Sequence, residues 1–184
     1  KKVIYYIMDW RYKSKRESLR AWIDNNCDVT ELKCIAKTFK GTNDEKIIQI
    51  LKYVNYSIKY VSDKKTWKVD EKWQTPLETF QLKTGDCEDG ACLIYSLANL
   101  SGIPDYLIRI VASDVVGGGH CYVCYSAEED GIERVIDWCY YYNSKDIPLR
   151  DFYVELEDYY YGEREWFSFN RSSAYEPIGG ISNG

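Results

Sequence analysis

The chain contains a single histidine, His120, so only one imidazole is available for acid–base chemistry near neutral pH. Among its seven cysteines, Cys87 follows Thr84-Gly85-Asp86 and falls in the first turn of an expected helix. The N–H groups and dipole at a helix start favour a thiolate and help to hold an oxyanion during acyl transfer. We therefore predict that Cys87 is a nucleophile and that His120 is its general base.

An acidic partner for His120 is available in the apolar segment Val135-Ile136-Asp137-Trp138. A carboxylate inside such a strand needs a polar partner. An imidazole suits Asp137, because the carboxylate fixes the tautomer of the ring and stabilises its cation. Cys87, His120 and Asp137 thus follow one another in the order of a catalytic triad.

The pairing of the two strands decides whether His120 and Asp137 meet. A two-residue turn at Asp130-Gly131 would leave them roughly 13 Å apart along the strands. They lie opposite each other only if the loop spans Ala127–Asp130 or if a bulge shifts the register. We therefore predict the longer loop.

Hydrophobic and helix-capping patterns indicate helices first and strands afterwards. Expected helices cover Ser18–Asn25, Asp28–Phe39, a segment capped by Thr42 or Asn43 that reaches Ile58, a segment capped by Thr75 with Glu78, and Cys87–Ser101. Lys64–Lys72 is predicted to be a loop. Expected strands cover Tyr106–Ala112, Cys121–Ser126, Arg134–Tyr142, Phe152–Leu156 and Trp166–Asn170. The order predicts an α+β fold.

Length and charge limit the function classes. The 184 residues suit one domain, with 45% hydrophobic and 29% charged residues. The net charge is −5, and Lys and Arg are scattered among acids, which argues against a nucleic-acid partner. The apolar run near the N-terminus is too short to cross a membrane or to form a signal sequence. An odd number of cysteines then favours reduced thiols and a cytoplasmic location.

Several motifs together resemble the transglutaminase-like superfamily. They are Trp73-x-x-Pro76-x-Glu78, Gly85-Asp86-Cys87-Glu88-Asp89-Gly90-Ala91, Gly102-Ile103-Pro104, Gly119-His120-Cys121-Tyr122-Val123 and Val135-Ile136-Asp137-Trp138. The nearest group is the bacterial and phage-encoded transglutaminase-like cysteine proteinases. The resemblance implies a papain-related core at 44–142, in which a buried helix carrying the nucleophile packs on an antiparallel sheet. Residues 1–43 then form a helical extension and 143–184 a strand and loop extension of the single domain.

The resemblance also implies a calcium site at Asp86, Glu88 and Asp89. Three neighbouring carboxylates are only part of the six to eight oxygen ligands that calcium takes. The alternative is that Asp86 caps the helix and Asp89 completes a capping box. If these acids neither point away nor hold a cation, they raise the pKa of Cys87.

Two further motifs have two interpretations each. Trp73 and Gln74 are oxyanion-hole candidates by resemblance, whereas the alternative for Trp73 is packing against the core. Cys121-x-x-Cys124 beside His120 fits a zinc site, but cysteines three apart on a strand point to opposite faces.

The predicted function is a thiol enzyme that cleaves or transfers an amide of a protein or peptide through a Cys87 acyl-enzyme, namely a cysteine peptidase. A glutamine transamidase or deamidase would use the same triad. A non-catalytic binding or structural module, for example a phage-encoded one, is the alternative outside enzymes. No cofactor is required in this hypothesis, calcium is an optional ligand, and the sequence does not set the oligomeric state.

Overall fold

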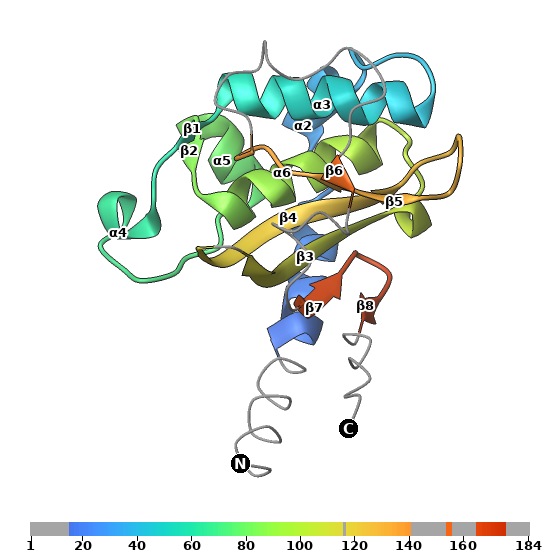
Figure 1. The fold of residues 1–184 in the computed structure, drawn as a ribbon. Coiled ribbons are helices and arrows are strands. Elements are labelled where there is room, and N and C mark those ends of the chain that lie inside the picture. The colour runs from blue at the N-terminus through green and yellow to red at the C-terminus, as the bar shows by residue number, and fades with distance from the viewer. Residues whose placement is uncertain (1–14, 116, 141–153, 156–164, 176–184) are drawn as a thin grey trace, which may run out of the picture.

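The computed structural model describes residues 15–115, 117–140, 154–155 and 165–175 (Figure 1). Residues 15–26 are helical. The further helices are α2 (Thr30–Ala36), α3 (Asn43–Ser57), α4 (Asp63–Thr66), α5 (Pro76–Leu82) and α6 (Cys87–Leu100), with a 3₁₀ turn at Asp105–Leu107. The strands are β1 (Lys59–Tyr60), β2 (Thr84–Gly85), β3 (Ile108–Val115), β4 (Gly118–Ser126), β5 (Glu133–Ile136), β6 (Val154–Glu155), β7 (Glu165–Phe169) and β8 (Ala174–Tyr175).

The sheet confirms the α+β class. Six strands follow the order β6-β5-β4-β3-β7-β8, and each neighbouring pair is antiparallel. The short strands β1 and β2 form a separate parallel pair, which the sequence did not predict. Figure 1 shows α6 lying between α3 and the sheet. The helix that carries the predicted nucleophile is therefore the centre of the layers.

Burial of α6 follows from its composition. It is apolar nearly all round, and residues 88–98 are all buried. Its Leu93, Ile94 and Leu97 lie in the core cluster with Ile47 of α3 and Val123 of β4. A helix with no polar face must be covered on every side, which is why α6 packs against helices above and strands below.

The predicted helix starts are confirmed at two capping boxes. Thr42 caps α3 and pairs with Glu45, and Thr75 caps α5 and pairs with Glu78. One prediction is wrong: Lys64–Lys72 is not entirely a loop, because α4 forms a single helical turn there.

The hairpin between β4 and β5 differs from the predicted register. The Ala127 N–H donates to the Ile132 carbonyl (3.1 Å), and the Gly131 N–H donates back to the Ala127 carbonyl (2.8 Å). Four residues, 128–131, thus form the loop, and Gly131 adopts the left-handed φ of +72° that glycine tolerates. The loop is longer than the tight Asp130-Gly131 turn, but it lies one residue beyond the predicted position.

This shift changes which residues face each other. Val123 pairs with Ile136, so continuing the register places Asp137 across from Tyr122 rather than from His120. The expectation that His120 and Asp137 are directly opposite is therefore wrong. They are diagonal neighbours, a separation that long side chains bridge.

Some predicted features fall outside the described residues. These are the end of the strand expected at Arg134–Tyr142 and most of the strand expected at Phe152–Leu156. Among the helices that the structure describes, none has the length and apolar character needed to cross a membrane.

Trp138 connects the segment after β5 to α6 through a hydrogen bond and close packing. Its indole Nε1 donates to the Cys87 carbonyl (3.3 Å), and the Asn55 side chain donates to the Trp138 carbonyl (2.8 Å). The indole lies directly against Gly90, where an added Cβ would approach Nε1 to 2.1 Å. Position 90 therefore has no room for a side chain.

We expect Gly90→Ala to destabilise the protein by about 1–3 kcal/mol through overpacking, although alanine is the better helix former. Chemical denaturation of the wild type and the variant measures the loss. A double-mutant cycle with Trp138→Leu tests the cause, because removing the indole relieves the clash. Equal costs of Gly90→Ala in both backgrounds would contradict the proposed contact.

Candidate active site

A cavity of about 420 Å³ lies beside the first turn of α6. Its walls include Lys15, Asp70, Glu71, Trp73, Asp86, Cys87, Glu88, Ala112, Gly119, His120, Cys121, Trp166 and Phe167. The predicted nucleophile and the predicted base therefore line the same cavity, although they are 33 positions apart in the sequence. A cavity of this size accommodates a side chain and part of a peptide backbone.

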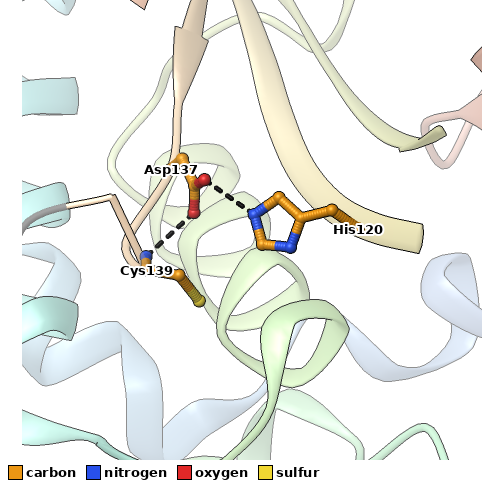
Figure 2. Close-up of side chains that lie close together, drawn as sticks. All are labelled: His120, Asp137 and Cys139. Carbon is orange, nitrogen blue, oxygen red and sulfur yellow. Dashed lines mark hydrogen bonds and ion pairs between the residues drawn. The ribbon is translucent and has the colours of Figure 1, made fainter. Parts of the chain in front are cut away.

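His120 and Asp137 make direct contact. His120 Nε2 hydrogen-bonds with Asp137 Oδ2 at 2.7 Å, as Figure 2 shows. The other carboxylate oxygen, Oδ1, accepts the backbone N–H of Cys139 at 2.8 Å. The carboxylate is held from two directions in a buried position, with 2% of its side chain exposed.

The end of β5 explains how Asp137 reaches His120. The strand ends at Ile136, and the Tyr140 N–H donates to the Asp137 carbonyl (3.3 Å) at the start of a turn. Asp137 is thus freed from the regular alternation of the strand. Because Nε2 faces the carboxylate, the neutral tautomer with its proton on Nε2 leaves Nδ1 as the basic nitrogen.

Cys87 has an acidic neighbour. Its Sγ donates to Glu88 Oε2 at 3.2 Å. Burial raises the pKa of the Cys87 thiol, the negative charge and hydrogen bond of Glu88 raise it further, and a hydrogen bond to the Cys121 backbone acts in the opposite direction. This environment favours the neutral thiol of Cys87, and the helix start alone does not offset the rise in pKa.

A second acidic group lies behind the nucleophile. Carboxylate oxygens of Asp63, Asp86 and Asp89 lie within 4.8 Å of one another, and all three residues are buried. The Asp63 N–H donates to Asp86 Oδ2 (3.2 Å), and the Asp86 N–H donates to Asp89 Oδ2 (3.2 Å). Asp63 was not predicted, whereas the capping-box arrangement of Asp86 and Asp89 was.

This acidic cluster has unused ligand atoms. Within the described part of the chain, Asp63 Oδ1 and Asp86 Oδ1 are buried and accept no hydrogen bond. Asp89 uses both of its oxygens, because Oδ1 accepts the Gln74 N–H at 2.8 Å. Two uncompensated carboxylate oxygens in a buried position are the donors that a hard cation needs.

The pKa values of Asp89, in this cluster, and of the neighbouring Glu88 are both raised. Burial, with the charge of Asp86 added, raises the pKa of Glu88 to about 9. Burial is likewise the main cause that raises the pKa of Asp89 to about 7, and backbone hydrogen bonds limit that rise.

The two oxyanion candidates lie in different surroundings. Trp73 lines the cavity, but its Nε1 donates to Glu71 Oε1 (2.8 Å) and its ring packs on Trp22 and Phe169. The predicted core-packing role of Trp73 is thus confirmed. Gln74 is 1% exposed, and neither polar atom of its side chain has a partner among the described residues.

The cysteines of Cys121-x-x-Cys124 point to opposite faces of the sheet. Cys121 belongs to the main core cluster, whereas Cys124 belongs to a second cluster with Val111, Val115, Tyr122 and Val135. The strand argument against a zinc site at this motif is therefore correct.

Comparisons with known proteins agree with this architecture. A family model described as a transglutaminase-like domain matches residues 30–159. Structures of Legionella pneumophila LapG match in an EGTA-treated form (16% identity, TM-score 0.58, 79% of this chain and 83% of that chain) and a calcium-bound form (18%, 0.52, 79% and 85%). No curated protein sequence matches the chain. At these identities the likeness to LapG concerns the fold.

The raised carboxyl pKa values predict how stability depends on pH. A carboxyl with a pKa higher in the folded than in the unfolded state stabilises the fold below its unfolded pKa of about 4.3, and this stabilisation is lost as pH rises through the folded pKa. In buffer freed of divalent cations, we therefore expect the melting temperature to fall between pH 5 and pH 9.

Glu88→Gln tests the assignment, since it removes the group whose pKa is about 9. We expect a shallower decline between pH 7 and pH 9 in this variant, and an unchanged one in the exposed control Glu31→Gln. A wild-type melting temperature that is constant or rises over this range would contradict the buried acidic cluster.

Proposed function

Because the chain belongs to the transglutaminase-like domain family, we propose that it is a thiol enzyme that hydrolyses an amide of a protein or peptide through a Cys87 acyl-enzyme. The observation that carries this proposal is the 2.7 Å pair of His120 and Asp137, with His120 and Cys87 in the wall of one cavity. This arrangement supports the assignment of Cys87 as nucleophile, His120 as base and Asp137 as the acid that orients it.

The first half of the reaction forms the acyl-enzyme. His120 Nδ1 takes the Sγ proton of Cys87, and the sulfur attacks the carbonyl carbon of the amide. The oxyanion lies next to the first turn of α6, whose N–H groups have no acceptors within the helix. The imidazolium, stabilised by Asp137, then gives its proton to the leaving amine as the C–N bond breaks.

The second half releases the acyl group. His120 takes a proton from a water molecule, the hydroxide attacks the thioester carbon, and the Cys87 sulfur leaves and regains its proton. An amine in place of water would give transamidation with the same proton transfers. We keep Gln74 as a candidate for a further oxyanion donor on the resemblance, because its backbone N–H binds Asp89 of α6 and its buried side-chain amide has no partner among the described residues.

A calcium ion fits the acidic cluster. Asp63 and Asp86 each offer a buried oxygen without a protein donor, and Asp89 completes the group. LapG is known in a calcium-bound and in an EGTA-treated form. We assign the same kind of ion to Asp63, Asp86 and Asp89, with Glu88 beside them.

The ion would act through its charge. Burial is the main cause of the raised pKa of the Cys87 thiol, and the charge of Asp86 and of the ionised form of Glu88 adds to it. A divalent cation among these acids compensates their charge, so the thiol loses its proton to His120 more easily. Calcium is then not a reactant but a condition for an activated nucleophile.

The triad assignment predicts the effect of single substitutions. We expect Cys87→Ala to abolish turnover of a glutamine-containing peptide, and His120→Ala and Asp137→Asn to lower kcat/KM by about 10²–10⁴-fold. Mass spectrometry of the peptide incubated with a labelled primary amine identifies the reaction. A shortened peptide indicates proteolysis, a labelled conjugate indicates transamidation, and conversion of Gln to Glu indicates deamidation.

The non-catalytic alternative gives a different result. If Cys87→Ala retains the wild-type rate, or if the folded wild type gives none of the three products with peptides or unfolded proteins, the enzyme proposal is wrong. Cys34→Ser serves as the control, since Cys34 is exposed and far along the chain from the triad.

The calcium assignment predicts the reactivity of Cys87. We expect calcium to increase the alkylation rate of Cys87 at pH 7 by about tenfold or more, which is one pKa unit of thiol ionisation. Peptide mass spectrometry locates the alkylated thiol, and Cys34 is the internal reference. Asp63→Asn should remove the calcium effect and Glu31→Gln should keep it; the opposite pattern would place the ion elsewhere.

A further inference from the structure

A second group of metal ligands lies on the other side of His120. Donor atoms of His120, Asp137 and Cys139 all lie within 4.8 Å of one another. Figure 2 shows the three side chains converging from β4 and from the turn that follows β5. Cys139 is not needed for the proposed reaction, so its thiol calls for another explanation.

The turn after Ile136 places the sulfur beside the carboxylate. The Cys139 N–H donates to Asp137 Oδ1, so the two residues that flank Trp138 are joined by a hydrogen bond. Trp138 is buried against α6 and cannot move freely. The thiol and the carboxylate are thus held together by the packing of the residue between them.

The donor types differ from those of the acidic cluster. Imidazole nitrogen, thiolate sulfur and one carboxylate oxygen suit zinc and similar borderline or soft cations, whereas calcium prefers oxygen alone. Tetrahedral zinc, with bonds of about 2.0–2.3 Å, holds its ligand atoms roughly 3.5 Å apart. The three donors already lie within 4.8 Å of one another, so binding of zinc requires them to approach by at most about 1.3 Å.

Charge favours a divalent cation at this place. The Asp137 side chain is 2% exposed and that of His120 is 10% exposed, so a net charge here is costly. One carboxylate and one thiolate cancel the charge of a divalent ion. The complex of His120, Asp137, deprotonated Cys139 and zinc is neutral, which suits a buried position.

We infer that His120, Asp137 and Cys139 form a binding site for zinc or a similar thiophilic divalent cation, and that this ion switches off the enzyme. The inhibitory part rests on the function proposed above. Coordination at Nε2 displaces Asp137 from the ring and puts the proton on Nδ1, so Nδ1 cannot accept the Cys87 proton. Coordination at Nδ1 occupies the base directly. Cys139 releases its proton to solvent as the ion binds.

Metal binding is tested without any activity. The chain carrying Cys87→Ala, in calcium-containing buffer, is titrated with zinc against a chromophoric chelator and with cadmium for thiolate charge-transfer absorption. Cys87→Ala removes the nearby nucleophile as a ligand, and calcium occupies the oxygen-only cluster. We expect one zinc ion per chain and a cadmium–thiolate band.

Substitution of one ligand identifies the site. Cys139→Ser in the same background should lose the cadmium–thiolate band and weaken zinc by more than about tenfold, the effect expected even for an outer-shell partner. His120→Ala should also weaken zinc, and Cys34→Ser should change nothing. Cys139→Ala replaces the serine variant if the latter does not fold. Unchanged zinc affinity and an unchanged band in Cys139→Ser would overturn the site.

The inhibitory role has its own outcome. With the intact nucleophile, zinc should suppress turnover in the wild type, and the ratio of rates with and without zinc should approach one in Cys139→Ser. Zinc bound at this site without any change in that ratio would overturn the inhibitory role while leaving the site. Absence of turnover without zinc would refute the enzyme proposal, and the binding titration would still decide the site.

Discussion

The contact between the Trp138 indole and Gly90 joins the two parts of the chain on which the site depends. Gly90 is in α6, one turn after Cys87, and Trp138 lies between Asp137 and Cys139. The indole also donates to the Cys87 carbonyl, so the helix start and the turn after β5 are bound together near the chemistry. The contact therefore positions Asp137, next to Trp138 in the chain, relative to Cys87 at the start of α6. A glycine within a helix costs about 1 kcal/mol relative to alanine, and the close approach of the ring explains why a glycine stands at position 90.

The buried acids around Cys87 lower the stability of the folded state and also disfavour ionisation of the Cys87 thiol. Burial and the charge of Asp86 raise the pKa of Glu88 and Asp89. Burial is also the main cause of the raised pKa of the Cys87 thiol, and Asp86 and the ionised form of Glu88 raise it further. Both effects persist unless a positive charge compensates these carboxylates. A bound cation would compensate both costs at once, since the stability of the folded state and the ionisation of the thiol respond to one charge. Stability and activity are then linked through the occupancy of a single ion site.

Sequence patterns predicted the helices and strands better than the tertiary contacts between them. Capping residues such as Thr42 and Thr75 gave the helix starts, and the apolar run gave the buried helix α6. The contact between His120 and Asp137 was predicted as well, but through a register that does not form, because the hairpin loop lies at 128–131 rather than at Ala127–Asp130. Asp63 reaches the acidic cluster only through the pairing of β1 with β2, where Tyr60 lies beside Gly85. A two-residue parallel pair has no sequence signature, so the place of Asp63 in this cluster could not be predicted.

The two proposed ion sites differ in the chemistry of their donors, and that difference sets opposite effects on one thiol. Asp63, Asp86 and Asp89 offer oxygen alone, so a hard cation binds there, compensates negative charge near Cys87 and leaves His120 untouched. The site of His120 and Cys139 offers nitrogen and sulfur, so a softer cation binds there and takes the base itself. In both groups the ligand atoms already lie within 4.8 Å of one another. Ligand type thus decides whether an ion activates or inhibits. The imidazole of His120 is decisive, because the proton of Cys87 and the softer metal compete for its lone pair.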